Sequence, residues 1–128
     1  MKDSDNLAAN ITEIVPAIVL MLDEQGKILH YNPYMEELSG YPLSEMKGRD
    51  WFDKFLPTHD HERVRDLFDQ TLKQVETIGY GQIVTRDGKV KDIEWHNRTL
   101  HGPDDTVNGV LAIGLNVTAR HQLEARLQ

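Results

Sequence analysis

The chain has 128 residues, a formal net charge of −7 at pH 7, a hydrophobic fraction of 39% and a charged fraction of 27%. This length fits one domain, and the composition is typical of a globular protein rather than a disordered one. The negative charge argues against nucleic-acid binding, which needs clustered Lys and Arg, and the lack of cysteine excludes disulfides and thiolate metal sites.

The chain begins with a segment of helical periodicity. Apolar residues recur at helical spacing in residues 4–14, and Pro16 ends the pattern. We therefore expect residues 1–16 to form an N-terminal flanking helix. The apolar run that follows is far shorter than the roughly 20 residues of a membrane helix, so we expect no membrane insertion by this segment and a cytoplasmic location.

Alternation and turn residues predict the next elements. We expect, in chain order, a strand at 17–22, a returning strand at 28–31, a helix from 33 to about 39, a short helix at 43–47 and an irregular, aromatic-rich segment at 51–57. Asn32 as N-cap and Pro33 at the first helical position mark the start of the first of these helices. Gly40 marks its end.

The clearest periodicity predicts a helix with one buried face. Its apolar stripe consists of Val64, Leu67, Phe68, Thr71, Leu72 and Val75. Three strands then follow at 78–85, 90–100 and 107–117, and their short connections make them antiparallel neighbours. Residues 118–128 form a last helix. This order predicts an α+β domain with one antiparallel sheet covered on one face by helices.

Several short motifs occur in a characteristic order. They are Leu22-Asp23-Glu24-Gln25-Gly26-Lys27-Ile28, Tyr31-Asn32-Pro33, Leu38-Ser39-Gly40-Tyr41, Met46-Lys47-Gly48-Arg49-Asp50, Thr85-Arg86-Asp87-Gly88-Lys89, Ile93-Glu94-Trp95-His96-Asn97 and Gly114-Leu115-Asn116-Val117-Thr118. With this spacing, from about Ile11 to Leu127, the chain resembles the PAS family of sensory domains. One departure is Asn116, where the family usually has Asp. An asparagine keeps a hydrogen bond there but cannot form a charged pair.

The resemblance implies a domain organisation and a role. It implies a five-stranded PAS-like sheet within residues 17–118, preceded by the flanking helix and followed by the start of a signalling helix at 119–128. The family binds a small ligand or cofactor between sheet and helices, often dimerises, and relays its state to an effector in the same chain. For this chain the resemblance implies a non-catalytic sensor of a bacterial signalling protein, acting on a kinase or a cyclic-dinucleotide enzyme, as in two-component or diguanylate cyclase regulation.

Strand alternation and the resemblance together predict a ligand pocket. In the 90–100 strand the less charged face is taken as the inner one, and matching to flavin-binding relatives turns the small residues of the 107–117 strand inward. The predicted ligand-binding residues are Met21, Phe68, Ile83, Ile93, Trp95, Asn97, Val110, Ala112 and Gly114. The alternative is that these side chains fill one another's space, which would leave a ligand-free dimerisation and relay domain.

The identity of any cofactor stays open. The adduct-forming cysteine of blue-light flavin relatives is missing, and the positions of their flavin-binding amides align with Ile83 and Ile93. No histidine occupies the stretch 64–68, where haem-binding relatives carry one. His59 and His61 do not share a helix face, so we expect no metal site. The inward row offers only Asn97 and Thr99 as polar groups, so we expect no catalytic residue.

Two further surfaces complete the predictions. The 107–117 strand turns three apolar residues outward, and we expect the first helix to cover them, from the same chain or from a symmetry mate in a homodimer. The predicted interface consists of Leu7, Ile11, Leu111, Ile113 and Leu115. Asn116 and Thr118 are the predicted relay residues, with Thr118 as the N-cap of the last helix. That helix has no stop signal, so we expect it to continue toward the effector.

Overall fold

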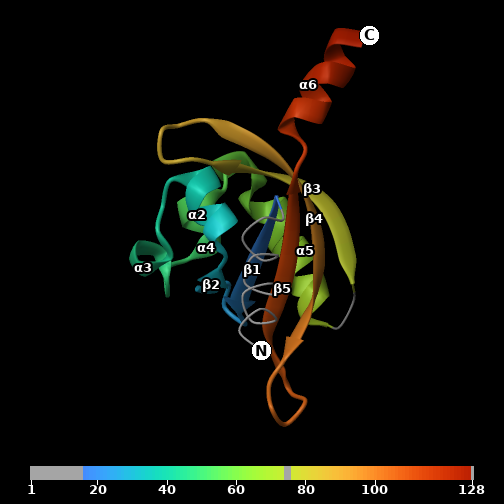
Figure 1. Cartoon of the computed structure of the whole chain (residues 1–128). Helices are drawn as coiled ribbons and strands as arrows, with labels where there is room; N and C mark the ends of the chain where they lie inside the picture. The colour runs from blue at the N-terminus through green and yellow to red at the C-terminus, as the bar shows by residue number, and fades with distance from the viewer. Residues whose placement is uncertain (1–15, 74–75, 128) are drawn as a thin grey trace, which may run out of the picture.

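The computed structural model describes residues 16–73 and 76–127. Nearly all of the predicted flanking helix, residues 1–16, therefore lies outside the described residues. The elements follow the chain (Figure 1) in the order β1 (Ala17–Asp23), β2 (Ile28–Tyr31), α2 (Pro33–Ser39), α3 (Leu43–Met46), α4 (Trp51–Phe55), the 3-10 helix η1 (Thr58–Asp60), α5 (His61–Leu72), β3 (Thr77–Val84), β4 (Val90–His101), β5 (Val107–Asn116) and α6 (Thr118–Leu127). The predicted α+β class is confirmed.

The five strands form one antiparallel sheet in the order β2-β1-β5-β4-β3. β1 and β5 are neighbours at its centre although they lie at opposite ends of the chain. Leu20 faces Ala112 and Leu22 faces Val110 in this pair, and facing residues in an antiparallel ladder share one side of the sheet. Helices α2, α4 and α5 lie over one face (Figure 1), which we call the inner face.

The start of α2 ties that helix to the sheet. Asn32 is the N-cap, and its side-chain Oδ1 accepts hydrogen bonds from the N–H groups of Met35 (3.4 Å) and Val19 (3.0 Å). Its Nδ2 donates to the carbonyl of Ala17 at 2.8 Å. The predicted cap is confirmed, and it also fixes α2 to β1. Gly40 ends the helix with φ of 81°, a conformation that favours glycine.

The aromatic segment differs from its prediction because it is helical. The Asp50 carboxylate accepts hydrogen bonds from the N–H groups of Phe52 (2.9 Å) and Asp53 (3.3 Å), and so caps α4. α4 buries Trp51, Phe52 and Phe55. A helix of five residues is too short for a 3.6-residue period to appear in the sequence, and the prediction of an irregular segment was wrong for that reason.

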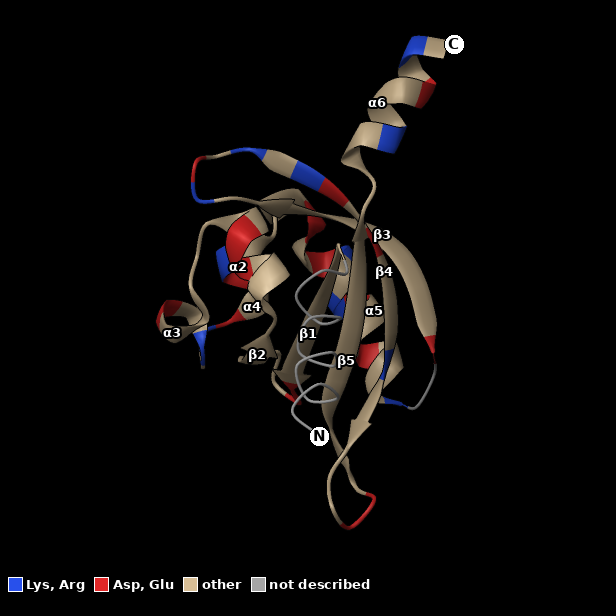
Figure 2. Cartoon of the chain, in the orientation of Figure 1, with Lys and Arg blue, Asp and Glu red and all other residues tan. Residues whose placement is uncertain are grey.

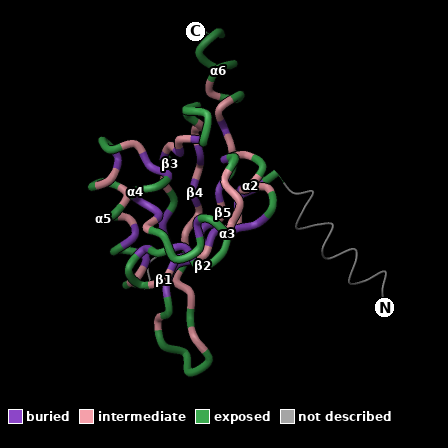
Figure 3. The backbone as a smooth tube through the Cα atoms, turned by 90° about the vertical axis from the view of Figure 1, so that its left-hand side faces the viewer, coloured by how far each residue is buried: buried purple, intermediate pink, exposed green. Residues whose placement is uncertain are grey.

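The core lies between these helices and the inner face of the sheet. Figure 3 shows buried residues along the strands and exposed residues in the loops and in α6. Phe55 is fully buried, stacks on Trp51 with ring centres 4.8 Å apart, and meets Tyr31 edge to face at 6.0 Å. The Tyr31 hydroxyl donates to the carbonyl of Tyr41 at 2.7 Å, and burial raises the pKa of Tyr31.

α6 projects away from the rest of the domain (Figure 1). It contains no buried residue among those described, and Leu123 and Leu127 are 54% and 79% exposed. A ten-residue helix without a buried face is marginal in water. Within the described ranges, no helix has the length and apolarity needed to cross a membrane.

Candidate functional site

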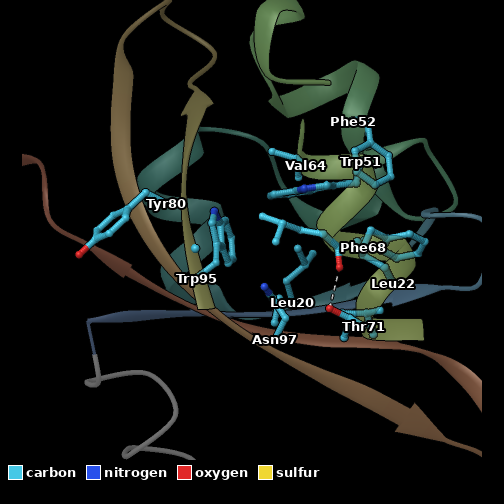
Figure 4. A pocket seen from close by; sticks show the side chains of 14 residues that line it. Leu20, Leu22, Trp51, Phe52, Val64, Phe68, Thr71, Tyr80, Trp95 and Asn97 are labelled. Carbon is cyan, nitrogen blue, oxygen red and sulfur yellow. Dashed lines mark hydrogen bonds between the residues drawn. The ribbon is translucent and has the colours of Figure 1, made fainter. Parts of the chain in front are cut away.

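A cavity of about 50 Å³ lies between α4, α5 and the inner face of the sheet (Figure 4). Its lining residues are Leu20, Leu22, Trp51, Phe52, Val64, Leu67, Phe68, Thr71, Gly79, Tyr80, Trp95, Asn97, Val110 and Ala112. Tyr80 takes part through its backbone, because its ring points away from the cavity and is exposed (Figure 4). No Lys, Arg, His, Asp or Glu lines the cavity. Its wall is therefore uncharged and mainly apolar, and it includes the aromatic rings of Trp51, Phe52, Phe68 and Trp95.

Paired aromatic rings hold this wall in shape. Trp51 of α4 and Trp95 of β4 meet edge to face with ring centres 5.8 Å apart. Phe52 and Phe68 form a second edge-to-face pair at 5.5 Å, which joins α4 to α5. Such pairs contribute about 0.5–1.5 kcal/mol beyond the burial of their area. The two pairs thus connect α4 to β4 and to α5 across the cavity wall.

One row of polar side chains borders the cavity. Asn97 Nδ2 donates to Thr77 Oγ1 at 3.1 Å, Thr77 Oγ1 lies 2.8 Å from Thr71 Oγ1, and the Thr71 hydroxyl donates to the carbonyl of Leu67 at 2.9 Å. Because Thr71 gives its single proton to Leu67, the Thr77 hydroxyl donates to Thr71. The hydrogen bonds among the described residues leave Asn97 Oδ1 without a donor.

Five of the predicted pocket residues line the cavity. They are Phe68, Trp95, Asn97, Val110 and Ala112. All except Asn97 are buried, and Asn97 is half-buried. The inner face assigned to β4 from its alternation, and the inner face assigned to β5 by matching to flavin-binding relatives, therefore agree with the structure.

Met21 does not line the cavity, and its assignment is corrected. Met21 faces Leu111 across the β1–β5 ladder, on the outer side of the sheet, whereas Leu20 and Leu22 face the small inner residues of β5. β1 is apolar at every position from 17 to 22. Its sequence therefore contains no alternation from which the inner face could be assigned.

Three other predicted residues lie on the inner face but outside the cavity. Ile83 and Ile93 have no exposed surface and pack further along the sheet. Gly114 lies beneath Trp95: a β carbon there would be 2.7 Å from Cζ3 of that ring and 2.8 Å from Cγ2 of Ile93. Glycine at this position lets the indole pack directly on the backbone of β5.

Several lining residues were missing from the prediction. Trp51 and Phe52 were missed because their segment was read as irregular. Val64, Leu67 and Thr71 belong to the same predicted stripe as Phe68, so the periodicity of α5 could have identified them. Gly79 has no side chain, and only the antiparallel register with β4 brings it to the cavity.

The junction between β5 and α6 is anchored on β4. The Thr118 hydroxyl accepts from the N–H of Asp92 at 2.7 Å and donates to Asn116 Oδ1 at 2.7 Å. Asn116 Oδ1 also accepts from the N–H of Thr118 at 3.1 Å, and the N–H of Val117 donates to the carbonyl of Asp92 at 2.8 Å. The hydrogen bond expected at Asn116 is present, with its Oδ1 as the acceptor. The prediction of Thr118 as N-cap is wrong, since Thr118 is the first helical residue and Asn116 supplies the acceptor.

Ion pairs on the outer side of β4 add to this anchor. Arg120 Nη2 lies 3.2 Å from Glu94 Oε2, and His121 Nδ1 lies 3.5 Å from Asp92 Oδ2. Hydrogen bonds from His96 and Arg120 lower the pKa of Glu94. These partly exposed pairs are weak individually. The Arg120–Glu94 pair nevertheless supplies a charged link to α6 that the uncharged Asn116 cannot make.

The outer face of the sheet is apolar along its centre. β5 contains no charged residue (Figure 2), and Leu111 and Ile113 are half-buried while Leu115 is 40% exposed. The predicted partners of this face, Leu7 and Ile11, lie outside the described residues. The predicted dimer interface therefore stays a prediction.

The two histidines near the start of α5 are separated. The His59 side chain is 74% exposed. His61 is half-buried, with Nε2 3.1 Å from the carbonyl of Leu56. Over residues 16–73 and 76–127, no group of three or more His, Cys, Asp or Glu side chains is arranged to hold a metal ion.

Comparison with known proteins gives the same architecture. A family described as the PAS fold matches residues 12–122. A PAS domain from Colwellia psychrerythraea has a TM-score of 0.78 at 22% identity and covers 92% of this chain and 100% of its own. The Cronobacter turicensis RpfR quorum-sensing receptor PAS domain in complex with C12:0 has a TM-score of 0.71 at 20% identity, covering 81% and 96%.

A third similar structure is the N-terminal domain of a diguanylate cyclase with PAS/PAC sensor from Marinobacter aquaeolei. Its TM-score is 0.68 at 20% identity, and the match covers 82% of this chain and 98% of that one. At these identities the structures establish the fold, and the family match extends over most of the chain. The chain belongs to the PAS fold family of sensory domains.

Proposed function

We propose that this PAS domain senses a small, mainly apolar molecule in the cavity between α5 and the sheet, and relays its presence through α6. The observation that carries this proposal is the position of Trp95. Trp95 lines the cavity, and the six-membered part of its ring lies on Gly114. Gly114 precedes Asn116, the last residue of β5 before the α6 junction, by two residues. A ligand that moves Trp95 therefore acts directly on the strand that leads into α6.

The chemistry of the wall supports an uncharged ligand. No cation lines the cavity, and burying a carboxylate without a partner is unfavourable. No acid–base pair lines it either, which supports binding rather than catalysis. The similar Cronobacter turicensis RpfR PAS domain in complex with C12:0 supports a ligand with an apolar part.

The size of the cavity supports a coupled movement. A volume of about 50 Å³ is small beside the engineered cavities of roughly 150 Å³ that admit benzene. Ligand binding therefore requires α5 or Trp95 to shift. We propose that this shift alters the hydrogen bonds among Asn116, Thr118 and Asp92, and with them the direction or the pairing of α6.

The proposed target is an effector in the same chain, either a kinase or a cyclic-dinucleotide enzyme. The similarity to the sensor domain of a diguanylate cyclase supports the second of these. In a full-length protein, insertion of one to four residues after Leu127 should change effector activity with helical periodicity. Activity that ignores the length of the insertion would contradict relay through α6.

A ligand-free dimerisation and relay domain is the second candidate. The small cavity and the apolar outer face around Leu111, Ile113 and Leu115 favour it. In this function, the N-terminal segment or a second copy covers the outer face, and the signal comes from a change in pairing. The two candidates differ in whether the cavity is ever occupied.

Tryptophan fluorescence tests occupancy directly, because both tryptophans of the chain line the cavity. Titration with octanamide should shift or quench the emission of the wild type. Ala112→Leu should abolish the change, since Ala112 is 4% exposed and a larger side chain there would fill the cavity. Ala125→Leu, at an exposed position of α6, is the matched control. If neither octanamide nor dodecanoic acid gives saturable binding to the wild type, the ligand-free function is favoured.

A further inference from the structure

The mouth of the cavity lies between α5 and β3. Every lining residue contributed by β1, α4 and β5 is buried. In contrast, Val64 and Leu67 of α5 and Gly79 of β3 are only half-buried. The exposed part of the lining therefore runs along one seam, where α5 crosses the edge strand of the sheet.

Two glycines keep the sheet side of this seam free of side chains. A β carbon at Gly79 would lie 3.0 Å from Cδ1 of Leu67, and one at Gly81 would lie 3.9 Å from Cγ2 of Val64. Neither glycine has a positive φ. The backbone conformation therefore does not require glycine. The close approach of Leu67 favours glycine at position 79, and the indole of Trp95, with Nε1 at 3.3 Å, favours it at position 81. Leu67 and Val64 are the only side chains among the described residues that contact these two positions from α5.

The seam also holds a hydrogen-bond donor without an acceptor. Trp95 is 8% exposed, and its Nε1 lies 3.3 Å from the position of a β carbon at Gly81. The hydrogen bonds of the described residues include no acceptor for this N–H. No fully buried polar side-chain atom in the same residues lacks a partner, so the nitrogen is open to the seam. Open to the seam, this N–H can donate to water or to a ligand.

Asn97 supplies an acceptor on the same face of β4. It follows Trp95 by two residues, which separates their Cα atoms by about 7 Å. Its Nδ2 is used by Thr77, while Oδ1 receives no hydrogen bond within the described part of the chain. The Trp95 N–H lies at Gly81, however, and the Asn97 amide lies at Thr77, which pairs with Asn97 further along β3. Only the indole N–H of Trp95 therefore lies where the two glycines leave the seam open.

We propose that ligands enter between α5 and β3 over Gly79 and Gly81, and that their polar end stays at this seam, where Trp95 Nε1 donates a hydrogen bond to it. The matching chemical class is a small apolar molecule with one neutral hydrogen-bond acceptor, such as a primary amide or an alcohol. Leu67 is the gate that moves to admit it. This inference rests on the proposed sensory function and specifies the ligand class and the route.

Stopped-flow tryptophan fluorescence with octanamide tests the route. Leu67→Ala should raise the association rate by roughly tenfold, because it removes the side chain that closes the mouth. Leu67 also lines the cavity, so the association rate, and not Kd, is the readout. Gly79→Ala should lower this rate. Gly102→Ala, where the nearest atom to the new methyl is 3.6 Å away, is the matched control and should leave it unchanged. Circular dichroism checks that each variant is folded. If Gly79→Ala does not fold, the association rate of Leu67→Ala decides whether the proposed route is correct.

Comparison of octanamide with octanoate tests the polar end. At about pH 7 the wild type should bind the amide roughly tenfold more tightly, and Trp95→Phe should remove this preference while Trp51 still reports binding. If the wild type binds neither probe, both the sensory function and this inference are wrong. If it binds octanamide but the Leu67 variant has wild-type rates, or if the amide is not preferred, this inference alone is overturned.

Discussion

Gly114→Ala tests the contact on which the relay depends. The added methyl would lie 2.7 Å from Trp95 Cζ3 and 2.8 Å from Ile93 Cγ2. Both distances are shorter than real contacts of a β carbon, and neither neighbour is the end of a flexible chain. Overpacking of this kind costs about 1–3 kcal/mol. We expect the free energy of unfolding to fall by that amount.

The same substitution should also affect the cavity. Trp95 can relieve the contact only by moving away from β5, which brings it into a space of about 50 Å³. We therefore expect weaker octanamide binding and a shifted tryptophan emission in the folded variant. Urea unfolding followed by circular dichroism gives the stability, with Gly102→Ala as the control expected within about 0.5 kcal/mol of wild type. If Gly114→Ala is as stable as that control, Trp95 does not pack on β5 and the proposed relay contact is absent.

Four further predictions follow from single contacts. Phe68→Ala should lower the free energy of unfolding by about 3–5 kcal/mol, measured in urea, because it removes a buried ring that joins α5 to α4. Thr118→Val should speed amide hydrogen exchange in α6, because it removes the hydroxyl that accepts from Asp92 and donates to Asn116. The pKa of Glu94 is lowered, so the stabilisation that its carboxylate gives to α6 through Arg120 is fully present above the ordinary glutamate pKa of about 4.3. This stabilisation is lost as pH falls through the lowered pKa. Protection factors in the first turn of α6, which correct for the pH dependence of intrinsic amide exchange, should therefore fall only at such acid pH. Leu115→Glu should weaken dimerisation, measured by light scattering, if the outer face is the interface.

Much of the fold could be predicted because strong local patterns determine it. α2 starts where the Asn32 side chain caps it and Pro33 occupies its first position. It ends where Gly40 adopts a positive φ. The stripe of α5 repeats over enough residues for its buried face to be unambiguous. α4 could not be predicted in this way, because its short span shows no period and its start depends on one carboxylate, Asp50.

The candidate site was predictable where β4 alternates, where α5 has its apolar stripe, and on β5 where the resemblance supplied the inner face. β4 mixes polar and apolar residues, so the inner positions of Trp95 and Asn97 could be assigned. β1 is uniformly apolar, and Met21 was placed on the wrong face for that reason. The location of the mouth could not be read from the sequence at all. It depends on two glycines that meet α5 only after the register of β3 with β4 is known.

Two-dimensional ¹H–¹⁵N NMR of the domain during titration with octanamide tests the central claim most directly. The chain has two tryptophans, so two indole N–H signals report on the cavity. The account predicts that the Trp95 indole signal moves downfield as its N–H gains an acceptor, and that the amides of Asn116, Val117 and Thr118 shift with the same dissociation constant. An unchanged Trp95 indole signal at saturation, or indole shifts without any change at the α6 junction, would contradict the account.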